Sequence, residues 1–330
     1  METTTKIPGA AEACISLFSE AKFTANLAKM ATEELLFMAL ASVRVNPTQS
    51  IALLNKVWER QSKDGFLPAF HSSKIPALPL AGLILDKVYR SVPVGAEIET
   101  HFKEYVKKSL SNHQWWYKNA ADEDTSMLKV SYDWEHAAIK RLVTAVFDND
   151  LLVNKTEDDA PSALFNAIIT ASNESLIHLG GKLGLDISDL MYAQEMGIYC
   201  MDEKFWDDSM GTYNIGPTEY LPQPLNEVIL MSGGIPTQDQ AEQLLARLCI
   251  FAELDQMALE FPDGIETTPQ FMALMEQPFF SWLLIIGLLK YDMEDMAEVV
   301  SGFFLKKFES QPYNEDQVFL SAMYMNILQA

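Results

Sequence analysis

The sequence predicts an all-α fold in which paired helices close into an (α/α)6 toroid. Helical periodicity recurs along most of the chain, and no convincing run of alternating apolar and polar residues predicts a strand. Two predicted helices, 162–179 and 279–289, are apolar nearly all round. A helix without a polar face must be covered on most sides, as the inner helices of a toroid are covered by the outer ones. We therefore expect one domain, residues 1–330, built of about six helical hairpins.

In the first half of the chain, apolar spacing and helix-ending residues delimit the elements. Residues spaced three and four apart form one face of the first helix: Leu35, Leu36, Ala39, Leu40 and Val43. Pro47 suits the start of the second helix. Gly184 suits the C-terminal cap of a later helix, and Asp186 or Ser188 can cap the next one. The predicted helices are 31–43, 47–61, 76–89, 98–117, 133–147, 162–183 and 187–206.

The second half repeats this pattern of helices and short connections. Thr237 suits a helix N-cap, and Pro269 and Pro278 suit helix first turns. The predicted helices are 225–231, 237–251, 268–275, 278–289, 293–308 and 315–328. No Pro-, Gly- or Ser-rich linker and no short-period repeat divides the chain, so a single domain is the simplest prediction.

Composition and charge exclude several classes of protein. The 330 residues suffice for a large core, and 48% of them are apolar. The net charge is −22, from 46 acidic and 24 basic side chains, so the surface should repel nucleic acids and anionic membranes. The longest apolar run, Phe279 to Leu289, is far shorter than the ~20 residues needed to cross a bilayer. We expect no nucleic-acid partner and no membrane association.

The cysteines and the first residues indicate a reducing compartment. Cys14, Cys200 and Cys249 are far apart in apolar helical surroundings, which is typical of buried free thiols. The start of the chain, residues 1–9, does not have the pattern of a secretory signal. No Cys/His cluster has metal-ligand spacing, and no phosphate-binding loop or dinucleotide fingerprint appears. We therefore expect a cytoplasmic protein without a metal or cofactor.

The segment 150–213 is the most informative part of the chain. It contains Phe-Asn-Ala-Ile-Ile at 165–169, Leu-Gly at 183–184, Phe-Trp-Asp-Asp at 205–208 and Gly-Thr-Tyr at 211–213. This succession resembles a segment of the (α/α)6-barrel glycosidases that include mannosylglycerate and glucosylglycerate hydrolases, relatives of processing α-glucosidase and trehalase. Residues 37–41, 61–68 and 234–241 resemble further motifs of this family, in the family's order. The resemblance covers most of the chain and implies the same barrel.

The resemblance also implies a pair of catalytic carboxyls. The family's general-acid motif corresponds to residues 131–137, where Asp133 or Glu135 would be the acid, and its general-base motif corresponds to 307–313, where Glu309 would be the base. Inverting hydrolysis needs two such carboxyls ~6.5–9.5 Å apart, one protonated and one ionised. Two other readings stay open. Asp133 could simply cap its helix, and Glu309 could be an exposed residue at a charged helix end.

Other positions match or depart from the family's sugar-binding motifs. Glu33 stands where a Trp-Asp pair usually begins the first helix, and the family's arginine is missing beside Gln277. Aromatic rings can stack on sugar faces, and Trp134 lies beside the candidate acid. Most other tryptophans, notably Trp206 and Trp282, are expected in the core, and His71 and His136 could equally be structural. The predicted substrate-binding residues are Glu33, Phe37, His71, Trp116, Trp134, Gln277 and Tyr313.

Two functions are compatible with these observations. The first is an inverting glycoside hydrolase-like enzyme that acts on a small α-linked glycoside. The second is a catalytically inactive (α/α)6 scaffold that binds a carbohydrate or a protein partner. The second is motivated by the missing Trp-Asp pair and arginine, because substrate-positioning groups can change rates by orders of magnitude. The sequence does not predict an oligomeric state.

Overall fold

Helices make up almost all of the structure described by this computed structural model. It describes residues 27–92, 95–130, 132–142, 161–215, 223–251, 277–310 and 318–328. The helices of the first half are α2 (Thr32–Ser42), α3 (Pro47–Trp58), α4 (Ala81–Ser91), α5 (Ala96–Ala120), α6 (Tyr132–Leu142), α7 (Ala163–Lys182) and α8 (Ser188–Phe205). Those of the second half are α9 (Gln223–Ser232), α10 (Gln238–Phe251), α12 (Pro278–Lys290), α13 (Glu294–Ser310) and α14 (Val318–Leu328).

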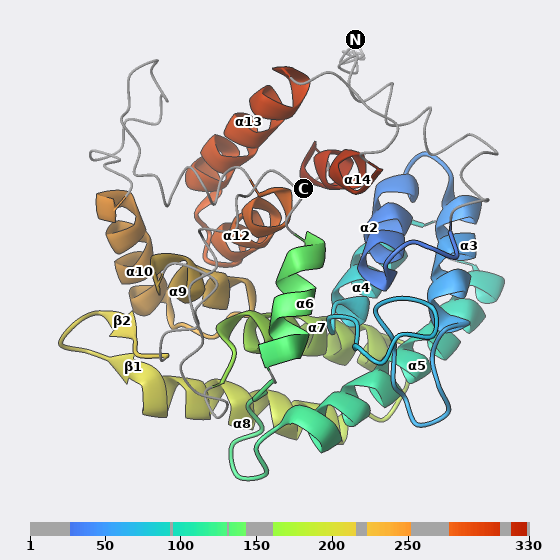
Figure 1. The fold of residues 1–330 in the computed structure, drawn as a ribbon, viewed down its shortest axis with the longest axis horizontal. Helices are drawn as coiled ribbons and strands as arrows, with labels where there is room; N and C mark the ends of the chain where they lie inside the picture. Colours follow the sequence, from blue (N-terminus) through green and yellow to red (C-terminus); the bar gives the residue numbers. More distant parts are fainter. Residues whose placement is uncertain are drawn as a thin grey trace.

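Among the described residues, six helices contact one another in a closed ring. In ring order they are α2, α4, α7, α9, α12 and α14, and α14 contacts α2 again. The other helices pack outside: α3 on α2, α5 on α4 and α7, α8 on α7, α10 on α9, and α13 on α12 and α14. Figure 1 shows α14 beside α2, so the ends of the described chain meet to close the ring. The predicted two-layer arrangement of paired helices is confirmed.

Burial explains why the inner helices lack a polar face. From Pro278 to Ile285 every side chain of α12 is buried, and α2 is buried at all but one position. The aromatic rings of Phe37 and Trp282 meet edge to face with centroids 4.9 Å apart, which joins α2 to α12. An inner helix is covered by two neighbours and by an outer helix, so apolar side chains are stable on every face.

Local residues set several helix boundaries, and Pro47 and Gly184 do so as predicted. The side chain of Asn46 accepts a hydrogen bond from the backbone of Gln49, and Pro47 then begins α3. Ser162 caps α7 through the backbone nitrogen of Phe165. Gly184 follows α7 with a φ of +67°, a conformation that glycine adopts without the cost of a Cβ.

Two expectations about local structure were wrong. The helix predicted for 76–89 begins only at Ala81, because the backbone before it is committed elsewhere: Ala77 donates to Leu67, and Leu78 donates to Glu33. A short hairpin, β1 (Trp206–Asp207) and β2 (Thr212–Tyr213), also occurs where only helix and loop were expected.

Some expectations concern parts of the chain that the structure does not describe. The predicted helix 268–275 and the residue Tyr313 lie outside the described residues. Where side chains are described, Cys200 is a buried free thiol, as predicted. No helix in the described ranges is both long enough and apolar enough to span a membrane.

Candidate functional site

The inner helices begin at the same rim of the ring. An outer helix returns the chain between successive inner helices, so the inner helices run in the same direction. Glu33 is the second residue of α2, Ser162 is the N-cap of α7, and Gln277 is the N-cap of α12. These three side chains therefore lie at the rim where the inner helices start. We take this rim as the candidate functional site.

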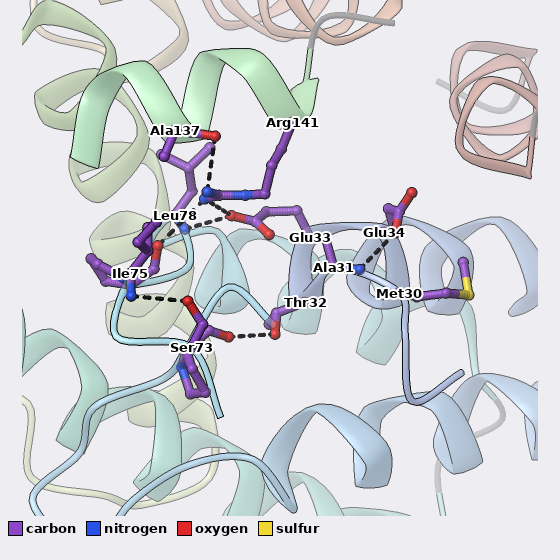
Figure 2. A network of polar contacts seen from close by, with 12 residues as sticks. Met30, Ala31, Thr32, Glu33, Glu34, Ser73, Ile75, Leu78, Ala137 and Arg141 are labelled. Atoms are coloured by element: carbon purple, nitrogen blue, oxygen red, sulfur yellow. Dashed lines mark hydrogen bonds and ion pairs between the residues drawn. The ribbon is translucent and has the colours of Figure 1, made fainter. Parts of the chain in front are cut away.

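A buried ion pair joins Glu33 to Arg141 of α6. Nη2 of Arg141 donates to Oε1 of Glu33 over 2.8 Å, and the backbone nitrogen of Leu78 donates to the same oxygen over 3.0 Å (Figure 2). The Glu33 side chain is 1% exposed and that of Arg141 is 9% exposed. A buried charge is costly unless it is paired. The pair therefore explains how both side chains lie inside the protein.

Arg141 also contacts two other parts of the rim. Its Nη1 donates to the carbonyl oxygen of Ala137 over 2.9 Å, one turn earlier on α6. Its guanidinium carbon lies 6.0 Å from the ring centroid of Phe70. Two polar atoms of the ion pair have no partner in the structure, namely Oε2 of Glu33 and Nε of Arg141, and both are buried.

A second pair of charges lies at the start of α2. Oε2 of Glu34 accepts from the backbone nitrogen of Ala31, and burial raises the pKa of this carboxyl. The guanidinium of Arg60 donates to the carbonyl oxygens of Leu27 and Met30. Burial lowers the pKa of Arg60, against the attraction of the nearby carboxylates. The carboxylates of Glu33 and Glu34 and the guanidinium groups of Arg60 and Arg141 thus stabilise the start of α2.

Side chains of α6 contact the starts of α2 and α7 and aromatic rings of α5. Figure 1 shows α6 near the middle of the ring. The ring of Trp134 lies 5.9 Å from those of Trp115 and Trp116. The hydroxyl of Ser162 donates to Oε1 of Glu135 over 2.5 Å. One end of α6 is therefore tied to the start of α7, and Arg141 ties the other end to the start of α2.

The two candidates for the general acid have different surroundings. Glu135 is buried, and burial raises the pKa of its carboxyl, while the hydrogen bond from Ser162 lowers it by a smaller amount. Asp133 is exposed in the first turn of α6, where a carboxylate interacts favourably with the helix dipole. Burial thus distinguishes the two carboxyls that the sequence left as alternatives.

The candidate base, Glu309, lies in the last turn of α13. Because α13 returns antiparallel to α12, this end of α13 is on the side of the rim where α12 begins. The backbone of Glu309 therefore lies on that side. Its side chain lies outside what the structure describes.

Two predicted sugar contacts are fully buried aromatic residues. Phe37 packs against the rings of Phe279 and Trp282. Trp116 is 0% exposed and packs against Trp134 and Phe165. Neither ring has free surface for a sugar in this structure, so both contribute to packing beneath the rim.

The remaining predicted contacts occupy three different environments. Gln277 is buried, and its Oε1 has no hydrogen-bond partner in the structure. His71 is exposed in the loop between α3 and α4, and Trp134 is half-buried. No group of three His, Cys, Asp or Glu side chains that could hold a metal ion occurs within the described residues.

Sequence reasoning did not find Arg141. This residue is 108 positions from Glu33, so no local motif connects the two. A signal was nevertheless present. Arg141 lies between Ala138 and Leu142 on the apolar face of α6, and a charge at such a position needs a partner.

Comparison with solved structures identifies the class of fold. A GH63 mannosylglycerate hydrolase from Thermus thermophilus, in complex with Tris and D-glycerate, is 15% identical with a TM-score of 0.70, and the match covers 96% of this chain and 98% of that chain. Neutral trehalase from Saccharomyces cerevisiae is 10% identical with a TM-score of 0.62, over 90% and 70% of the two chains. A rhamnosidase from Klebsiella oxytoca with rhamnose bound is 13% identical with a TM-score of 0.56, over 89% and 54%.

The chain therefore has the (α/α)6-barrel fold that these glycosidases share. The predicted fold class and the resemblance to glycosidases of this kind are confirmed. No protein-family model and no curated protein sequence matches the chain. At these identities the structural likeness establishes the fold alone.

Proposed function

We propose that this protein is an inverting glycoside hydrolase that acts on a small α-linked glycoside at the rim of the inner helices. In this proposal Glu135 is the general acid and Glu309 is the general base. The acid must be protonated when the substrate binds, and the base must be ionised to activate a water molecule. The product would be released with the opposite anomeric configuration.

The burial of Glu135 is the observation that supports this assignment best. A general acid works near neutral pH when its pKa is raised, and burial raises the pKa of Glu135. Its hydrogen bond to Ser162 fixes the carboxyl at the start of α7. Asp133 is exposed, so a role in starting α6 explains it without chemistry.

The structural neighbours suggest the kind of ligand. The Thermus thermophilus hydrolase has been solved with glucose and with Tris and D-glycerate, and the rhamnosidase with rhamnose. All of these molecules bear hydroxyl groups. Glu33 and Gln277 lie at the rim with buried oxygens that lack partners, and such acceptors suit hydroxyl donors. Trp134 is the half-buried aromatic residue we propose for stacking on the sugar.

The test is a panel of α-glucosides and α-mannosides, including glycerate-linked ones, with the first-formed anomer followed by NMR. We expect turnover of at least one member with inversion. The variants Glu135→Gln and Glu309→Gln should each lose most of the activity, and Asp133→Asn should keep it. Asp189→Asn, which alters an exposed carboxylate in the first turn of α8, is the matched control.

Three outcomes would contradict the proposal. Full activity in Glu135→Gln would exclude the proposed acid, and retention of configuration would exclude the inverting mechanism. Binding of a sugar by the wild type without turnover of any α-glycoside would instead favour a carbohydrate-binding scaffold.

A further inference from the structure

The ion pair at the rim leaves one acceptor and one donor without partners. Oε1 of Glu33 receives two hydrogen bonds, from Arg141 and from Leu78, while Oε2 receives none. Nε of Arg141 likewise donates to nothing. Buried polar atoms are nearly always hydrogen-bonded, so each exception needs a physical explanation. Here the two atoms without a hydrogen-bond partner belong to the two members of one ion pair, Glu33 and Arg141.

A hydroxyl group offers both the donor and the acceptor that these two atoms need. A hydroxyl donates one hydrogen bond and accepts others, whereas an ammonium group only donates and an ionised carboxylate only accepts. A ligand hydroxyl placed beside the pair would donate to Oε2 of Glu33 and accept from Nε of Arg141. Hydrogen bonds to charged groups are stronger than neutral ones, so the contact would contribute to ligand selection.

We propose that Arg141 is a specificity-determining residue, and that its ion pair with Glu33 recognises one particular hydroxyl of the sugar. Arg141 positions the Glu33 carboxylate through Nη2 and contacts the ligand through Nε. The inference rests on the proposed function, because it assumes that a sugar binds at this rim. It adds a residue from α6 that no sequence motif indicated, and it restricts the ligand to one with a hydroxyl at a defined position.

The burial of the two atoms has a further consequence. Both are inaccessible in the structure, and Arg141 belongs to α6. A ligand therefore reaches them only when α6 moves aside, and it holds α6 in place once it is bound. Ligand binding should slow hydrogen exchange of the α6 amides, residues 132–142.

The experiment compares sugar binding by the wild type and by Arg141→Lys. Lysine keeps the positive charge but lacks the Nε donor of the guanidinium group. Affinities for D-glucose and D-mannose are measured by NMR titration, followed by each monodeoxy analogue of the sugar that binds. Arg90→Lys is the matched control, because Arg90 forms an ion pair with Asp86 near the end of α4, away from the rim.

We expect Arg141→Lys to weaken the parent sugar about tenfold, the typical effect of one hydrogen bond to a charged group. For one monodeoxy analogue the wild type and Arg141→Lys should bind equally weakly, because the hydroxyl that Arg141 recognises is absent. Glu33→Gln should lose its discrimination against the same analogue. Arg90→Lys should bind every sugar as the wild type does.

A merely structural role would give another pattern. If Arg141→Lys weakens all analogues by the same factor, or weakens none, the inference is wrong even though the sugar binds. If the wild type binds neither sugar and turns over no member of the glycoside panel, the proposed function fails, and the inference fails with it. Should Arg141→Lys fold poorly, Glu33→Gln and the exchange of α6 with and without sugar decide the question alone.

Discussion

Acidification should destabilise this protein through one buried histidine, His113 of α5. Its Nδ1 lies 2.6 Å from Oδ1 of Asn173, and its Nε2 lies 3.1 Å from Oγ of Ser172. Because the amide nitrogen of Asn173 donates to Tyr117, its oxygen is the atom left to accept from His113. The neutral ring therefore has Nδ1–H as donor and Nε2 as acceptor, and both nitrogens are satisfied without a charge.

The size of the effect follows from the pKa of His113. Burial lowers this pKa from 6.5 to about 4. At ~1.4 kcal/mol per pKa unit, the difference corresponds to about 3 kcal/mol. The unfolded chain binds the proton as the pH falls through about 6.5, whereas the folded protein binds it only near pH 4. The free energy of unfolding should thus fall by up to about 3 kcal/mol between pH 7 and pH 4 from this residue alone.

The assay is urea unfolding followed by tryptophan fluorescence, at several pH values from 7 down to about 4, for the wild type and His113→Gln. Carboxyl groups also titrate in this range. The difference in the free energy of unfolding between wild type and His113→Gln therefore isolates the contribution of the histidine. We expect His113→Gln to be less sensitive to pH by about 3 kcal/mol over this range. His101→Gln, at an exposed position of the same helix, should behave as the wild type. A wild-type-minus-variant difference that does not change with pH would refute the reasoning.

Three further predictions test the packing and the site. A Cβ added at Gly82 would lie 2.6 Å from the backbone oxygen of Ser172, so Gly82→Ala should lower the free energy of unfolding by about 1–3 kcal/mol. A Cβ added at Gly302 would meet open space, so Gly302→Ala should raise the free energy of unfolding by up to about 1 kcal/mol. Urea unfolding measures both changes. Phe37→Ala should cost about 3–5 kcal/mol in the same assay, and a cost below about 1 kcal/mol would show that this ring is not core. Ser162→Ala removes a hydrogen bond that lowers the pKa of Glu135, so the pKa of Glu135 should rise further. A carboxyl NMR titration measures this pKa, and an unchanged value would contradict the hydrogen bond assigned between Ser162 and Glu135.

The sequence predicted the helices well because their ends are marked by local chemistry. Pro47 and Gly184 act where the pattern placed them, and the predicted helix start at 162 coincides with the Ser162 cap. The start of α4 was missed because it depends on a distant residue: Leu78 donates its backbone hydrogen to Glu33, and no periodicity within 76–89 reports that contact. Local signals predict local structure, and long-range hydrogen bonds override them.

The site was less predictable for a related reason. Phe37 lies off the apolar face predicted for its helix. In the structure nearly the whole surface of α2 is covered, so residues off that face are buried as well. Arg141 was missed because its partner lies on another helix. The resemblance left Asp133 and Glu135 as alternatives for the acid, and the structure adds that Asp133 is exposed and Glu135 is buried.

The placement of α6 connects the proposed acid with the arginine that we propose for sugar recognition. Glu135 contacts the start of α7 and Arg141 contacts the start of α2, while α4 lies between these two helices in the ring. At 1.5 Å per residue the two contacts are about 9 Å apart along α6, so α6 links the starts of two inner helices that are not neighbours in the ring. The proposed acid and the arginine proposed for sugar recognition thus share one helix, so a displacement of α6 would move both at once.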